Sequence, residues 1–248
     1  MSYQPKFTLT SRLSAHVDDI VLLRERILAS ETRGRVMPPL REESRVPFTL
    51  ERVRTLANGR DFPVLAERST QGVLDYFARR FSVERKSGRR CWTHKDIVKL
   101  HSVIASGDVI DDGAAGQYRC IPVRAGSFMP PPPGDVSGLM SGLLEWWNTK
   151  GPELPGVLTS AIVHYRISDI HPFTDGNGRL GRALALWELY RRGFDSPLVL
   201  PLNERYWGER KEYYAALRTV PRRAQDLTSW LEYSAEGLRS ALGRVLRS

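Results

Sequence analysis

The sequence predicts a mostly α-helical fold with one small β-hairpin. Three observations support this prediction. Apolar residues recur at helical spacing through most of the chain, and no alternation of strands with helices points to a doubly wound sheet. One glycine-punctuated stretch, residues 106–134, carries short alternating runs that are typical of a hairpin. With 248 residues, 41% apolar and 26% charged, the chain has a composition near the average for globular proteins and can bury a core.

The first part of the chain predicts a helix, a break and the start of another helix. Residues 17–28 carry apolar side chains at helical spacing, and the prolines within residues 37–47 suit a short, broken connection after them. Thr49 then suits the cap of a new helix, because acid follows in the first turn. We therefore treat residues 1–65 as an N-terminal helical extension and a candidate regulatory segment, and residues 66–248 as the main domain.

Six further helices follow from apolar periodicity. They are predicted at Leu74–Phe81, Thr93–Ile104, Val136–Trp147, Val157–Asp169, Arg179–Arg191 and Leu227–Val245. Asp96 lies three residues after Thr93, which is the spacing of a capping box.

The hairpin is predicted from two short runs and a turn. Residues 117–121 and 123–124 alternate in polarity, and Ala125-Gly126 supplies the turn between them and Phe128. The four prolines at 130–133 then require an extended backbone.

Charge and cysteine content limit the classes of function. The net charge is +9, and 31 of the 37 basic residues are arginine, but they are scattered rather than gathered into an arm. Nucleic-acid binding is therefore disfavoured, although charge alone leaves it open. Two cysteines are too few for a disulfide framework or a thiolate metal site, and no apolar run is long enough to span a bilayer. Without a signal peptide, a cytoplasmic location is expected, and secretion by a route that needs no N-terminal signal stays open.

The stretch that carries chemistry is residues 171–182, His-Pro-Phe-Thr-Asp-Gly-Asn-Gly-Arg-Leu-Gly-Arg, which joins two predicted helices. Pro172 disfavours helix at the residue before it, and the second helix begins near Asn177. Free N–H groups and the helix dipole make such a start an anion site. Arg179 and Arg182 share one helix face there. With Asp175 as a ligand for Mg²⁺, these groups suit a metal-bound polyphosphate.

These twelve residues match the Fic motif, H-P-F-x-D/E-G-N-G-R-x-x-R, at every specified position. The chain therefore resembles the Fic (Fido) family. Weaker likenesses cover about residues 70–245: residues 164–170 resemble the helix before the motif, residues 128–133 the flap, and residues 212–217 a closing helix. The resemblance implies a Fic/Fido helical fold with a small β-hairpin flap, in a catalytic domain spanning residues 66–248.

The resemblance also implies an activity, protein adenylyl transfer (AMPylation). Members transfer AMP from ATP, with Mg²⁺, to a Ser, Thr or Tyr hydroxyl of a target protein and release pyrophosphate. His171 would be the general base and Asp175 the Mg²⁺ ligand. The phosphate-binding residues would be Gly176, Asn177 and Gly178 as the anion hole, with the Asn177 side chain on the α-phosphate, and Arg179 and Arg182 at the β/γ end.

Two further assignments come from the same resemblance. Val123 and Arg124 would lie in the flap that aligns the target segment by strand addition. Tyr213 or Tyr214 would wall the adenine pocket, and the alternative is that both are ordinary packing residues of a helix.

Regulation and assembly are less determined. Many Fic proteins carry an inhibitory S/T-x-x-x-E-G/N helix whose glutamate pairs with the second motif arginine, here Arg182. No segment matches it cleanly, and Glu43 is the best degenerate candidate. Either the glutamate is absent, or a degenerate version lies within residues 20–45. Members of the family are often dimers, so a homodimer stays open.

Alternative functions remain. One is transfer of another nucleoside monophosphate or a phosphate group to protein. Another is a non-catalytic nucleotide-binding or interaction module, although the presence of both His171 and Arg182 argues against it. The unaltered Gly-Asn-Gly-Arg run favours nucleotidyl transfer, with AMP first.

Overall fold

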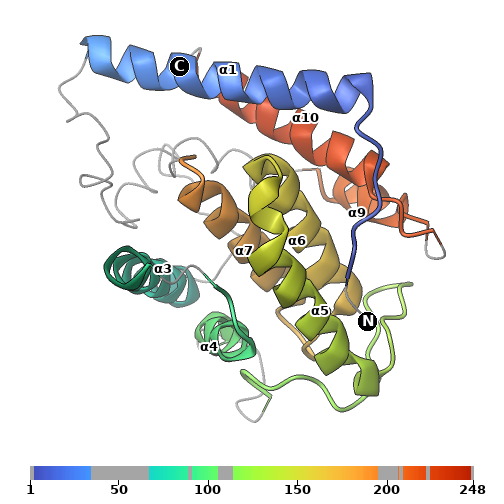
Figure 1. Cartoon of the computed structure of the whole chain (residues 1–248). Coiled ribbons are helices and arrows are strands. Elements are labelled where there is room, and N and C mark those ends of the chain that lie inside the picture. The colour runs from blue at the N-terminus through green and yellow to red at the C-terminus, as the bar shows by residue number, and fades with distance from the viewer. Residues whose placement is uncertain are drawn as a thin grey trace. The chain divides into compact units, whose positions relative to one another are not determined.

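The computed structural model describes residues 3–34, 67–88, 91–105, 114–194, 206, 209–221 and 224–246 (Figure 1). Its regular elements in these ranges are helices. They are α1 (Ser11–Gly34), α3 (Glu67–Ser87), α4 (His94–Ala105), the 3₁₀ turn η2 (Pro133–Asp135), α5 (Val136–Thr149), the 3₁₀ turn η3 (Gly151–Glu153), α6 (Gly156–Ile170), α7 (Asn177–Arg191), α9 (Arg210–Arg218) and α10 (Thr228–Val245). The predicted mostly α fold is confirmed. Among the described helices, none is long and apolar enough to cross a membrane.

The chain divides into two compact units. The first comprises residues 1–5 and 62–188, and the second comprises residues 6–61 and 189–248. The predicted boundary between residues 65 and 66 falls outside the described residues, so the division into extension and catalytic domain stays a prediction. The helix expected after Thr49 also lies outside them.

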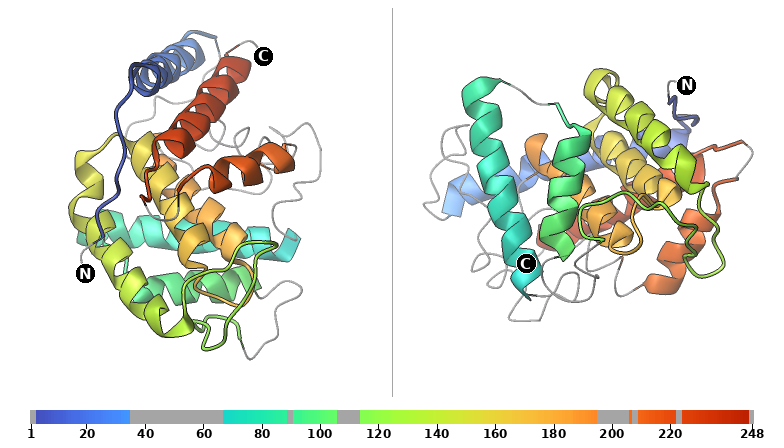
Figure 2. Two further views of the ribbon diagram at one scale, coloured as in Figure 1. Left: turned by 90° about the vertical axis from the view of Figure 1, so that its right-hand side faces the viewer. Right: turned by 90° about the horizontal axis from the view of Figure 1, so that it is seen from below.

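In the first unit, α5 packs beside α6, and α3 packs beside α4 (Figure 2). Twelve of the fifteen residues of α6 are buried, as expected of a central helix that is apolar nearly all round. Three buried tryptophans fill the core: Trp92 stacks on Trp147 with ring centroids 5.3 Å apart and meets the edge of Trp187 at 6.2 Å.

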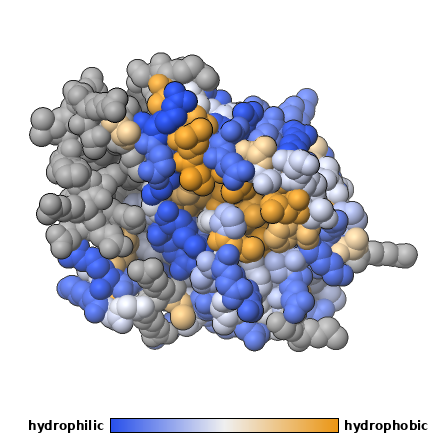
Figure 3. Space-filling view, turned by 45° about the horizontal axis from the view of Figure 1, so that its top comes forward, coloured by the Kyte–Doolittle hydropathy of each residue, from blue (hydrophilic) through white to orange (hydrophobic). Residues whose placement is uncertain are grey.

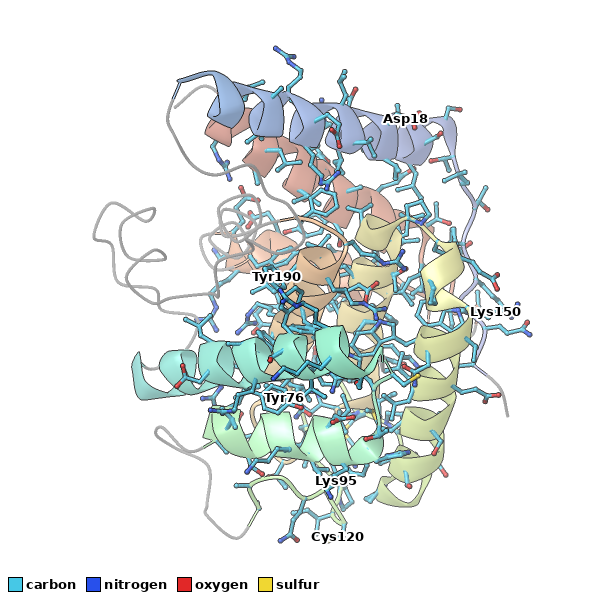
Figure 4. The ribbon with its side chains drawn as sticks, turned by 60° about the vertical axis from the view of Figure 1, so that its left-hand side comes forward. Asp18, Tyr76, Lys95, Cys120, Lys150 and Tyr190 are labelled. Carbon is cyan, nitrogen blue, oxygen red and sulfur yellow. The ribbon has the colours of Figure 1, made fainter. Side chains whose placement is uncertain are left out.

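The helices α3 and α4 are joined by polar contacts at their facing sides. Tyr76 of α3 donates its hydroxyl to the Asp96 carbonyl of α4 at 3.2 Å (Figure 4). The Arg80 guanidinium lies 3.8 Å from the centre of the Trp92 ring and 3.1 Å from the Asp96 carboxylate. The predicted capping box is confirmed, because the Asp96 carboxylate accepts the Thr93 N–H at 2.9 Å and Thr93 Oγ1 accepts the Asp96 N–H at 3.3 Å.

In the second unit, α1 lies along α10 (Figure 1). Leu13, Ile20 and Ile27 repeat every seven residues and are buried, which gives α1 one continuous apolar seam. Thr10 donates to Glu232 of α10 at 2.5 Å, so the helix pair is also fixed at its edge. Val21 and Leu22 of α1 are both exposed, and Figure 3 shows apolar residues gathered among hydrophilic ones on one face of the molecule.

The predicted hairpin is only partly present. Ala125 and Phe128 exchange two N–H···O bonds of 3.0 Å around Gly126, whose φ is +62°, so the predicted turn is confirmed. No strand flanks this turn within residues 114–132. The reason is that the backbone of this segment pairs elsewhere: Arg119 donates its N–H to the Pro172 carbonyl at 2.9 Å. The prolines that follow offer no N–H for a ladder.

Candidate active site

The site begins where α6 ends. His171 caps the helix in the left-handed conformation, with φ 51° and ψ 60°, and its N–H donates to the Ile167 carbonyl at 2.9 Å. For a residue with a Cβ this conformation is unfavourable, so its surroundings must hold it. Pro172 follows and prevents the helix from continuing.

The environment of the His171 imidazole leaves one ring nitrogen able to accept a proton. It is half-buried, and Nδ1 lies 3.3 Å from the Ser168 carbonyl. A carbonyl only accepts, so Nδ1 carries the hydrogen and the lone pair is left on Nε2. Burial lowers the pKa of His171 from 6.5, and the Arg119 charge lowers it further against the raising effects of Ser168 and Asp175. The ring is therefore neutral at neutral pH.

The loop between the helices is held from inside by Asn177. Its buried side chain accepts the Phe173 N–H at 2.9 Å and donates to the Phe173 carbonyl at 2.8 Å. Both ends of the carboxamide are thus engaged by the loop. The amide nitrogen carries a second N–H, so the predicted contact of this side chain with an α-phosphate stays a prediction; the backbone N–H of Asn177 lies at the start of α7.

His101 of α4 is a site residue that the sequence reasoning missed. Its ring stacks on the buried Phe173 ring, with centroids 3.6 Å apart. Nδ1 accepts the Gly116 N–H at 3.0 Å, so Nε2 carries the hydrogen and donates it to the Asp175 carbonyl at 2.9 Å. The sequence did hold one sign of it: His101 lies on the apolar face of a predicted helix, beside Leu100 and Ile104.

Asp175 stands before α7 with its carboxylate largely exposed, at 63%. One oxygen accepts the Gly176 N–H at 2.5 Å, and the other lies 3.8 Å from the Arg179 guanidinium. Within the described ranges, no group of three or more His, Cys, Asp or Glu side chains could hold a metal ion. A single exposed carboxylate suits Mg²⁺, which is commonly held by one or two carboxylates together with substrate phosphates.

The start of α7 gathers positive charge. Its first N–H groups have no acceptors within the helix and carry the positive end of the helix dipole. The Arg182 guanidinium lies over this turn, because a Cβ built on Gly178 would be 3.3 Å from its Nη1. Arg182 Nε is buried and finds no hydrogen-bond partner among the described residues. The arrangement suits an anionic ligand.

Comparison with known proteins agrees with this geometry. Residues 91–189, which include α4 to α6 and most of α7, match the sequence profile of the Fic/DOC family. This part of the chain is similar to the Fic/DOC family. The chain's helical architecture resembles a crystal structure of a Fic family protein from Desulfovibrio desulfuricans G20, with a TM-score of 0.67 and 26% identity over 99% of this chain and 77% of that one. Fic-1 (residues 134–508) from Caenorhabditis elegans shares the fold, with a TM-score of 0.62 and 22% identity over 95% of this chain and 72% of that one.

Curated proteins that are similar to this chain are named as adenylyltransferases. Protein adenylyltransferase Fic of Drosophila willistoni is 35% identical over 127 residues, which is 51% of this chain and 24% of that protein. Protein adenylyltransferase fic-1 of Caenorhabditis elegans is 31% identical over 153 residues, which is 61% of this chain and 28% of that protein. The matched part spans about a quarter of the length of these relatives.

The first unit brings together the motif residues but not every residue predicted from sequence. His171, Asp175, Asn177, Arg179 and Arg182 lie on one loop and the adjoining helix turn. Their roles toward a ligand stay predictions.

The remaining predicted residues lie in other parts of the chain. Val123 is half-buried and Arg124 exposed, in the segment before the Ala125–Phe128 turn. Tyr213 is buried in the second unit against Tyr206, at 5.1 Å between ring centroids, which fits a packing role. Tyr214 is 45% exposed. Glu43 lies outside the described residues, so its predicted inhibitory role stays untested.

Proposed function

We propose that this chain is a protein adenylyltransferase. It transfers AMP from ATP, with Mg²⁺, to a Ser, Thr or Tyr hydroxyl of a target protein. The observation that carries the proposal is the intact motif folded as one loop, with a neutral His171 before it and an arginine-flanked helix start after it. The names of the curated relatives support the same reaction.

His171 acts as the general base. Nε2 takes the hydroxyl proton while the hydroxyl oxygen forms a bond to the α-phosphorus. The bond from the α-phosphorus to the bridging oxygen breaks in line, and its electron pair leaves with pyrophosphate. The hydrogen bond of Nδ1 to Ser168 keeps the ring in the tautomer that this step requires.

The other motif residues bind the triphosphate. Asp175 provides the carboxylate that would hold Mg²⁺, and the ion, when bound, neutralises phosphate charge. Backbone N–H groups of Asn177 and Gly178 donate to phosphate oxygens at the start of α7. Arg179 and Arg182 stabilise the charge that develops on the leaving pyrophosphate.

The target polypeptide is proposed to lie along residues 121–124. Ile121 is 54% exposed and Arg124 is exposed, so the backbone of this segment is accessible at the surface. A segment without strand partners within residues 114–132 suits pairing with an incoming peptide backbone. The tight turn at Ala125–Phe128 fixes the end of this segment.

The proposal is tested by incubating the protein with Mg²⁺ and each nucleoside triphosphate labelled in the α-phosphate, alone and with bacterial lysate. We expect label from ATP, loss of label with His171→Ala, and retention with the matched control His16→Ala in α1. Preference for another nucleotide would change the assigned donor. Label that survives His171→Ala would contradict the mechanism.

The same assay separates the two interpretations of inhibition. Self-labelling by the wild-type chain favours a missing inhibitory glutamate. Labelling that appears only with Glu43→Gly favours a degenerate inhibitory segment that contains Glu43.

A further inference from the structure

Arg119 lies at the junction of three segments of the first unit. It is buried, at 4% exposure, in the segment between α4 and α5. Its guanidinium donates to the His171 carbonyl at 2.7 Å, to the Pro131 carbonyl at 2.6 Å, and more weakly to the Ile170 and Ile121 carbonyls at 3.3 Å. The backbone N–H of Arg119 donates to the Pro172 carbonyl at 2.9 Å.

These acceptors explain why a buried arginine is stable here. The carbonyls of Ile170 and His171 lie at the end of α6, where a helix leaves carbonyls without internal partners and carries the negative end of its dipole. A planar guanidinium offers five N–H donors in a fixed geometry, so it satisfies several such carbonyls at once. Hydrogen bonds from a charged donor are stronger than neutral ones.

The same contacts account for the backbone of His171. Its left-handed conformation is unfavourable by about 1–2 kcal/mol for a residue with a Cβ. Bonds from Arg119 to the Ile170 and His171 carbonyls, which lie on either side of the His171 Cα, oppose relaxation to another conformation. This backbone sets the direction of the Cα–Cβ bond of His171, and the Nδ1 contact with Ser168 sets the ring, so a held backbone keeps Nε2 in place.

We propose that Arg119 is a positioning residue for His171, fixing the general base and tying the target-facing segment to it. The proposal rests on the proposed function, since it assigns His171 the role of base. Through Ile121 and Pro131, the guanidinium reaches both sides of the Ala125–Phe128 turn. Base and target segment are therefore held by one side chain. The neighbouring Cys120 is exposed (Figure 4), so the segment is otherwise a surface segment.

The first test compares Arg119→Gln and Arg119→Lys with the control Arg80→Gln. Arg80 is a matched control because its side chain is also largely buried and also donates to a carbonyl, that of Cys91 at 2.7 Å. It belongs to α3 and makes no contact with His171 in the hydrogen bonds described above. We expect Arg119→Gln to lower kcat by about 100-fold with KM for ATP within about threefold, as misplacement of a reacting group does. Lysine keeps the charge but lacks the planar guanidinium with its several donors, so Arg119→Lys should retain about a tenth of the wild-type kcat.

The control separates positioning from loss of fold. Arg80→Gln should lower the melting temperature yet keep kcat within about twofold below that temperature. Equal losses of kcat in the Arg80 and Arg119 variants would overturn the proposal. So would an unchanged kcat in Arg119→Gln. If Arg119→Gln fails to fold, the same criteria apply to Arg119→Lys.

A second readout does not depend on catalysis. The imidazole NMR signals of His171, identified by their loss in His171→Ala, should shift or broaden in Arg119→Gln, while those of His16 stay in place. An unchanged His171 signal would overturn the proposal. If the wild-type chain shows no transfer but the His171 signal responds, adenylyl transfer fails as the function and the positioning by Arg119 stands.

Discussion

At the scale of single residues, the environment of His171 sets the pH range of the proposed reaction. Burial and the Arg119 charge lower its pKa below 6.5, and the base must be neutral to act. We expect kcat/KM to be constant above about pH 7 and to fall in acid with an inflection below the ordinary value. A pH–rate profile of the wild-type chain measures this. An inflection above the ordinary histidine value would contradict the assignment.

His164 gives a prediction for stability. It is buried in α6, and burial together with the Arg182 charge lowers its pKa to about 3. In the unfolded chain it takes up a proton near 6.5, which the folded state resists. The contribution of His164 to the free energy of unfolding is therefore fully present above pH 6.5. It falls in acid by up to about 1.4 kcal/mol per pH unit below 6.5. His101 and His171 add to the same slope.

Urea unfolding of the wild-type chain and of His164→Gln, at neutral pH and at about pH 5, measures this contribution. The variant should lose less stability between the two conditions than the wild-type chain does. Equal losses would show that His164 is not the group that resists protonation.

At the scale of elements, α6 and α7 approach closely at Gly181. A Cβ there would lie 3.1 Å from His164 Cδ2 and 3.3 Å from the His164 carbonyl oxygen. Gly138 in α5 is the matched control, because a Cβ there would meet nothing within 4 Å. We expect Gly138→Ala to raise the free energy of unfolding by about 0.5–1 kcal/mol. Gly181→Ala should lower it by about 1–3 kcal/mol because the site is overpacked. Stabilisation by both changes would contradict the close approach.

Element by element, the sequence predicted what local periodicity encodes. The expected helices 136–147 and 157–169 correspond to α5 and α6 within a few residues. The capping box could be predicted from two residues alone, Thr93 and Asp96. The helix predicted at 17–28 is longer, Ser11–Gly34, and Leu13, seven residues before Ile20, continues its buried apolar face beyond the predicted start.

What the sequence did not predict depends on contacts between distant segments. The motif from His171 to Arg182 was identified because its residues are adjacent in the chain. His101 and Arg119 were not, because both bind backbone carbonyls of remote segments, and a carbonyl leaves no trace in the pattern of residue types. The hairpin was overpredicted for the same reason, since residues 117–121 include a residue that pairs with Pro172.

At the scale of the whole molecule, the N-terminal helix is part of a folded unit with α10. Ile20 lies in the buried seam of α1, at 1% exposure, whereas Leu22 is 58% exposed on the same helix. We expect Ile20→Ala to destabilise the protein by about 2–5 kcal/mol and Leu22→Ala to change stability by less than about 0.5 kcal/mol. Chemical unfolding of both variants measures the difference. Equal effects would mean that α1 does not contribute a buried face.

The proposed function of the whole chain depends on which phosphorus of ATP is attacked. The most direct measurement incubates the protein and a lysate with Mg²⁺ and ATP labelled either in the α- or in the γ-phosphate, beside the His171→Ala variant. We expect protein-bound label from the α-phosphate alone, and none from the variant. Label from the γ-phosphate, or α-label that persists without His171, would contradict adenylyl transfer by this site.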